Sequence, residues 1–141
     1  MDKNDFAKNM LMLNILSQSA CESCEKELNK KNFLSTDTKI MFLIDSYERI
    51  SPSFLTQKLK IAKSNIALMC KKLINDGYIV PSQDLKDKRI VYYKLSDSGK
   101  NYLNEKIGEI QNSLEAACMK DNIDNITSCI KDLNEMLSKR F

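Results

Sequence analysis

The feature that most constrains the fold is a change of hydrophobic period at Gly77. Before it, apolar residues recur at spacings of three and four, which is typical of amphipathic helices. After it, residues 78–80 and 90–95 are rich in β-branched and aromatic side chains and flank the polar segment 83–88, a pattern that predicts a β-hairpin. A helix must therefore lead directly into a two-stranded hairpin.

Two short helices are predicted before this hairpin. Ser51-Pro52 opens the first, since serine caps helices and proline is tolerated at the first helical position. Gly77 is suited to the left-handed residue that ends the second. The apolar positions of the two helices are Phe54, Leu55, Leu59, Ile66, Leu68, Met69, Leu73 and Ile74. Two helices, a short turn between them and a following hairpin are the order of a winged helix-turn-helix.

Longer helices are predicted on both sides. Residues 5–31 contain no glycine or proline and repeat apolar residues with helical spacing. A further helix follows Thr36 or Asp37 as its cap and ends near Glu48, and Ser96 caps another long helix. The last helix repeats Ile123, Ile126, Ile130, Leu133 and Leu137, the seam of a helix that packs along another helix.

These elements predict a mainly α chain with a small β-hairpin wing. Residues 1–141 are expected to form one domain-sized chain, with the winged helix-turn-helix over 37–95. One subunit offers few partners for the apolar stripes of 5–31 and 96–140. We therefore expect these segments to be dimerisation helices of a homodimer.

Composition narrows the function. The chain has no histidine, so it lacks the commonest general base and metal-binding nitrogen, and it shows no glycine-rich phosphate loop or nucleophile-base pair. An enzyme is not expected, and no cofactor is predicted. The apolar runs are too short for a membrane span, and the acidic N-terminus does not resemble a secretion signal. The expected compartment is the cytoplasm.

The charge is unevenly distributed. The net charge is +3, but residues 49–94 hold ten basic and three acidic residues, a net +7, which leaves −4 for the rest. A basic centre between mildly acidic ends is what a module that contacts a phosphate backbone requires. A solvated lysine-rich surface would give the same count.

The second helix of the pair has the dimensions to enter a DNA major groove. Its candidate contacts with base edges or phosphates are Lys63, Ser64, Asn65, Ala67 and Lys71. Asparagine can bind adenine in a bidentate manner, and serine can bond a phosphate or a base. The alternative for these residues is an ordinary polar helix face.

The run from Asp84 to Gly99, DLKDKRIVYYKLSDSG, resembles the wing motif of the MarR (multiple antibiotic resistance regulator) family. The resemblance implies that Arg89 reaches into the minor groove, oriented by Asp87, with Lys86 and Lys88 beside it. The upstream segment matches the family in length, apolar positions and terminal glycine.

The turn before the second helix departs from the family pattern. Lys60 stands where the family often has glycine, and Ala62 stands where it has a capping serine. Alanine cannot cap a helix, which costs about 1 kcal/mol. Ser64 is therefore an alternative cap.

Cys21 and Cys24 form a Cys-x-x-Cys on nearly one helix face. Core packing, thiol-based redox sensing and half a metal site are the three interpretations, with packing favoured because no second such pair and no histidine exist to complete four ligands. Cys118 and Cys129 could join them only if the fold brought them close. Cys70 is expected to face the core.

The sequence thus predicts a regulator that binds double-stranded DNA, with an affinity altered by a small ligand or by oxidation. The alternative is a winged-helix protein-interaction module that does not bind DNA.

Overall fold

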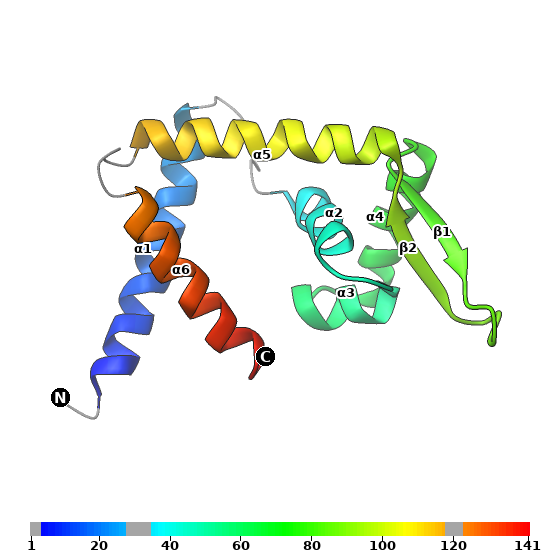
Figure 1. Ribbon diagram of the computed structural model, residues 1–141, viewed down its shortest axis with the longest axis horizontal. Coiled ribbons are helices and arrows are strands. Elements are labelled where there is room, and N and C mark those ends of the chain that lie inside the picture. Colours follow the sequence, from blue (N-terminus) through cyan, green and yellow to red (C-terminus); the bar gives the residue numbers. More distant parts are fainter. Residues whose placement is uncertain (1–3, 28–34, 118–122) are drawn as a thin grey trace. The chain divides into compact units, whose positions relative to one another are not determined.

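The computed structural model describes residues 4–27, 35–117 and 123–141. Its elements in chain order are α1 (Asp5–Glu27), α2 (Thr36–Ser46), α3 (Pro52–Leu59), α4 (Lys63–Asn75), β1 (Ile79–Gln83), β2 (Val91–Leu95), α5 (Asp97–Ala117) and α6 (Ile123–Ser138) (Figure 1). The chain divides into two compact units, one of residues 1–31 and 110–141 and the other of residues 32–109. The predicted class, mainly helical with a small hairpin, is confirmed.

The starts of α2 and α3 follow the capping rules, with one correction to the predicted residues. Ser51 caps α3 with Pro52 at its first turn, as predicted. The predicted cap of α2, Thr36 or Asp37, is wrong: both lie inside the helix, and the Ser35 hydroxyl accepts the N–H of Thr38 at 3.3 Å. Serine one residue earlier satisfies the same free amide group.

One helix end also differs from the sequence prediction. α2 ends at Ser46, two residues before the expected Glu48, because Tyr47 adopts an extended backbone that leads into a strand-like contact at Ile50. α1 is described as far as Glu27, so residues 28–31 of the predicted helix lie outside the described part of the chain.

One hydrophobic core occupies the unit of residues 32–109. Its members are Ile40, Met41, Ile44, Ile50, Leu55, Ile66, Cys70, Leu73, Ile79 and Leu103. Each fully buried aliphatic side chain contributes about 1.5–3 kcal/mol. The predicted burial of Cys70 is confirmed at 1% exposure. Burial raises the pKa of the Cys70 thiol to about 11, despite a hydrogen bond with Tyr93, so Cys70 is a packing residue with little thiolate at neutral pH.

The hairpin is longer at its first strand than predicted, because β1 runs through Pro81 to Gln83. The register pairs Ile79 with Leu95 and Pro81 with Tyr93. The Tyr93 N–H points away from β1 and donates to the Ile50 carbonyl at 2.8 Å. Pro81 and Tyr93 therefore form a non-hydrogen-bonded pair of the antiparallel ladder. Proline therefore costs the sheet no hydrogen bond at this position.

The start of α5 is fastened to the end of α4. Ser96 caps α5, as predicted, by accepting the N–H of Gly99 at 3.0 Å. Its own N–H donates to the Tyr78 carbonyl at 3.0 Å, and its hydroxyl donates to the carbonyl of Gly77. Gly77 has φ 79°, the predicted left-handed residue after α4. One serine thus satisfies both the turn after α4 and the first turn of α5.

Gly99 lies against the same turn. A Cβ atom at this position would overlap the Tyr78 carbonyl oxygen and lie 2.9 Å from the carbonyl carbon. Only glycine lets the first turn of α5 approach this backbone. The serine and glycine of the wing motif therefore hold the hairpin and α5 together.

Within the described residues, no helix combines the length and the apolar character needed to cross a membrane.

Candidate nucleic-acid interface

The helix-turn-helix consists of α3, a turn of three residues and α4. Lys60 ends α3 in the left-handed conformation, with φ 56°, and its N–H donates to the Thr56 carbonyl at 3.0 Å. A left-handed residue other than glycine costs about 1–2 kcal/mol. The turn therefore keeps the geometry that glycine usually provides, although the residue is lysine.

α4 begins without a side-chain cap. Ala62 is its N-cap residue and makes no capping hydrogen bond. The alternative that Ser64 caps the helix is wrong, because Ser64 lies inside the first turn and its side chain is exposed. Its hydroxyl is thus free for another partner.

The outer face of α4 is polar and basic. Ile66, Cys70 and Leu73 are buried on the opposite face. All five residues predicted from the sequence as major-groove contacts are exposed: Lys63, Ser64, Asn65, Ala67 and Lys71. The structure therefore brings these side chains together on one helix, with no acidic residue in the first turn of α4.

The wing tip holds Arg89 by a two-pronged contact with Asp87. The guanidinium Nε and Nη2 donate to Oδ1 and Oδ2 of Asp87, each at 3.1 Å, and the Arg89 N–H donates to Oδ1 at 3.0 Å. These contacts lower the pKa of Asp87 and raise that of Arg89. The arginine side chain remains 91% exposed. Asp87 thus fixes the direction of Arg89 without covering it, while Lys86 and Lys88 stay exposed nearby.

Asp84 shapes the loop that carries this arginine. Its carboxylate accepts the N–H groups of Lys86 at 2.7 Å and Asp87 at 3.3 Å, and the Tyr92 hydroxyl at 3.4 Å. The bonds from these two backbone groups hold the pKa of Asp84 below its ordinary value. An aspartate that bonds the backbone two and three residues ahead is a turn-forming device.

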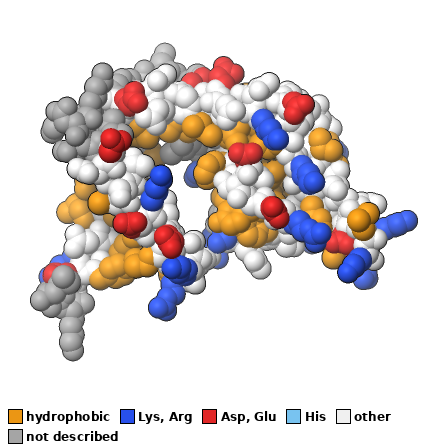
Figure 2. All heavy atoms as spheres, viewed as in Figure 1, with side chains coloured by type: hydrophobic (Ala, Val, Ile, Leu, Met, Phe, Trp, Pro, Cys, Tyr) orange, Lys and Arg blue, Asp and Glu red, His pale blue; other side chains and the backbone are white. Residues whose placement is uncertain are grey.

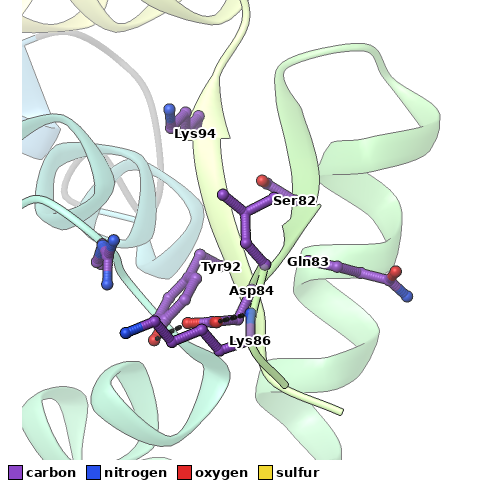
Figure 3. Close-up of a pocket in the computed structure, with 8 residues that line it drawn as sticks. Ser82, Gln83, Asp84, Lys86, Tyr92 and Lys94 are labelled. Atoms are coloured by element: carbon purple, nitrogen blue, oxygen red, sulfur yellow. Dashed lines mark hydrogen bonds between the residues drawn. The ribbon is translucent and has the colours of Figure 1, made fainter. Parts of the chain in front are cut away.

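A basic hollow of about 400 Å³ lies beside the wing (Figure 3). Arg49, Lys86 and Lys94 line it, and Asp84, its acidic residue, is engaged by the bonds described above. The Arg49 guanidinium carbon lies 5.7 Å from the centre of the Tyr92 ring. On the face drawn in Figure 2, basic side chains gather over the hairpin. The hollow therefore extends the positive surface of the wing.

Arg49 and Leu68 are two residues whose positions the sequence did not predict. Arg49 was counted among the basic residues of the central segment. Its position beside the wing depends on its backbone φ of 55° and on the β-bridge between Ile50 and Tyr93. Leu68 was listed only among the apolar positions of its helix, and it is 67% exposed. Because Leu68 stands two residues from both Ile66 and Cys70, it faces roughly away from them. That spacing is the sequence signal that could have indicated the exposure of Leu68.

The structure describes the side chains of three of the cysteines, Cys21, Cys70 and Cys129. Cys21 is half-buried and Cys129 is exposed. The side chain of Cys24 and the whole of Cys118 lie outside the described part of the chain. Among the side chains that the structure does describe, no group of three or more cysteine or acidic residues is placed to hold a metal ion.

The MarR family model matches residues 27–91, which include α2, α3, α4, β1 and the start of β2. This segment, slightly less than half of the chain, is similar to the MarR family. The resemblance to this family is thereby confirmed, and the family consists of transcription regulators and not enzymes.

Two curated proteins match part of the chain. The uncharacterized HTH-type transcriptional regulator YkoM of Bacillus subtilis is 32% identical over 91 residues, covering 62% of this chain and 57% of the relative. The transcriptional regulator AdcR of Streptococcus pneumoniae is 30% identical over 74 residues, covering 52% of this chain and 48% of the relative. The chain thus spans about half the length of the curated relatives it matches.

Solved structures of MarR and of other regulators share the fold. The Multiple Antibiotic Resistance Repressor, MarR, gives a TM-score of 0.70 at 17% identity, covering 89% of this chain and 92% of that one. The regulator BldR from Sulfolobus solfataricus gives 0.63 at 24% identity, covering 99% of both chains. An Escherichia coli MarR mutant complexed with operator DNA gives 0.59 at 17% identity, covering 94% and 99%. These similarities establish the MarR winged-helix fold.

Proposed function

We propose that this chain is a cytoplasmic transcriptional regulator that binds double-stranded DNA as a homodimer. α4 enters the major groove and the wing enters the minor groove. The observation that carries the proposal is the basic outer face of α4, which stands beside a wing whose exposed Arg89 is held by Asp87. The operator complex known for the E. coli relative supports the same use of this fold.

The two parts of the interface have separate roles. Asn65 and Ser64 can bond base edges, whereas Lys63 and Lys71 serve as phosphate contacts. Arg89 is suited to a narrow minor groove, where the negative potential is strongest. Lys86, Lys88 and Arg49 then contact phosphates on either side of that groove. Ala67 leaves room for close approach of the helix to the bases.

The salt dependence of binding tests the function. The duplex for this test is one that the protein selects from a random pool. We expect the affinity for it to fall on the order of 10³-fold or more between about 50 and 200 mM salt, because six or more neutralised phosphates release their counterions. Fluorescence anisotropy of a labelled duplex measures it. A protein-interaction module would bind the duplex weakly, with a small response to salt.

The dimer is proposed from the apolar surface of the outer helices. Six apolar side chains of α1 are at least 42% exposed, namely Phe6, Leu11, Met12, Leu13, Ile15 and Leu16. On α6, Ile126, Ile130 and Met136 are 45–49% exposed. Apolar side chains in such numbers indicate a partner surface. A second copy of the chain would cover them in a symmetric interface through α1, α5 and α6.

Light scattering at micromolar concentration is expected to return twice the 16.2 kDa mass of one chain. Ile130→Glu should shift the mass toward one chain, because it places a charge in an apolar interface. Leu85→Glu is the matched control: Leu85 is a fully exposed leucine on the wing loop, so its replacement should leave the mass unchanged. A wild-type mass of 16.2 kDa would refute the dimer.

The trigger that changes the DNA affinity is either a small ligand or thiol oxidation through Cys21 and Cys24. Repeating the anisotropy titration with peroxide distinguishes them. Sensing by this pair requires that peroxide release the wild type and not the Cys21→Ser, Cys24→Ser double variant. We infer a small ligand, because Cys21 is half-buried and oxidation of a thiol requires that the oxidant reach it. Release that depends on the two thiols would overturn this inference.

A further inference from the structure

Leu68 is an apolar side chain placed in the centre of a polar helix face. It is 67% exposed, whereas the adjacent Met69 packs against the core. Successive residues of an α-helix are about 100° apart, so a residue two positions from both Ile66 and Cys70 lies nearly opposite to each of them. Leu68 therefore contributes little to the core of its own chain.

Leu68 lies among the side chains of α4 that we propose to contact DNA. Ser64 lies one turn before it and Lys71 and Lys72 follow within a turn, all exposed. Residues three and four apart are neighbours on a helix surface. A leucine between hydroxyl and ammonium groups does not suit an extended apolar protein interface, which would need further apolar neighbours. A small apolar group beside phosphates and base edges suits Leu68 and these polar neighbours better.

One group in the major groove meets this description. The C5-methyl of thymine is the apolar group that base edges present there, and apolar side chains recognise it by contact. We propose that Leu68 is a specificity-determining residue that reads thymine in the operator through its C5-methyl group. The assignment rests on the proposed DNA-binding function and adds to it a base preference at the position opposite the middle of α4.

The test removes the methyl group and nothing else. The full-length wild-type protein selects its preferred duplex from a random pool. Each thymine of that duplex is then replaced, one at a time, by uracil, which lacks the C5-methyl and keeps the pairing. At one thymine per half-site we expect the affinity to fall about three- to fivefold, the value of burying one methyl group.

The variant L68A decides whether leucine is the reader. We expect L68A to bind the thymine duplex more weakly than the wild type and to bind the thymine and uracil duplexes equally. K71A is the matched control on the same face: loss of a phosphate contact should weaken both duplexes together and preserve their ratio. Circular dichroism should give the same helical content for all three proteins.

Three results would overturn the assignment. If no uracil replacement weakens the wild type, no methyl group is read. If L68A retains the full thymine-to-uracil ratio, another side chain reads it. If the wild type selects no duplex at all, the DNA-binding function fails and the base preference fails with it, a result that differs from the other two in showing no binding to any sequence.

Discussion

Gly99→Ala is expected to lower the free energy of unfolding by about 3 kcal/mol, since overpacking against an immobile group costs about this much. The new methyl group would overlap the Tyr78 carbonyl, which is backbone and cannot rotate away as a side chain can. Relief requires the first turn of α5 to move off the turn after α4, which breaks the Ser96 hydrogen bonds. Urea unfolding followed by circular dichroism measures the loss.

The same helix provides the control for this substitution. Gly108 also lies in α5, and a Cβ atom there meets no heavy atom within 4 Å. Gly108→Ala should therefore raise the free energy of unfolding by about 0.5–1 kcal/mol, because glycine inside a helix is less favourable than alanine. Both variants are measured at one protein concentration, since the stability of a dimer depends on it. Equal effects of the two alanines would refute the close-packing argument.

Arg89→Ala is expected to weaken binding to the selected duplex about 10- to 100-fold while leaving the fold intact. The side chain is 91% exposed and its partner, Asp87, lies in the same loop, so removing it deprives the core of no contact. An exposed ion pair of this kind contributes little to stability. Arg89→Lys should recover only part of the affinity, because lysine keeps the charge and loses the planar fork.

Arg140→Ala is the charge-matched control for that experiment. Arg140 is exposed beyond the end of α6, and its replacement by alanine removes the same charge from the chain as Arg89→Ala does. Anisotropy titrations at one salt concentration should show wild-type affinity for Arg140→Ala. If the two arginine variants bind alike, net charge and not the wing contact determines affinity.

The helix-turn-helix and the hairpin could be predicted because their signals are local. Ser51 and Pro52 determine the start of α3, and Gly77 ends α4, by requirements of backbone geometry that involve only neighbouring residues. The switch to β-branched and aromatic residues after Gly77 likewise depends on short-range preference. The wing motif added the Asp87 and Arg89 pair, whose contact is also between near neighbours.

What could not be predicted depends on contacts distant in sequence. The length of β1 follows from its pairing with β2. The strand tolerates Pro81 because the Tyr93 N–H points away from residue 81 and donates to the Ile50 carbonyl. Arg49 is placed by that same bridge. Leu68 and Met69 are both apolar, and hydrophobicity alone does not say which of the two faces the core. Ser35 was missed as a cap because Thr36 and Asp37 are equally capable residue types.

The arrangement around Pro81 also bears on how the protein avoids aggregation. In a pair without ladder bonds, the backbone nitrogen of residue 81 points away from β2, toward the open side of β1. Proline leaves no N–H there for an incoming strand. On the other side, Ile50 occupies the Tyr93 donor in the middle of β2. Both edges of the hairpin are therefore poor templates for strand addition. The exposed hairpin can thus avoid edge-to-edge pairing with the strands of other chains.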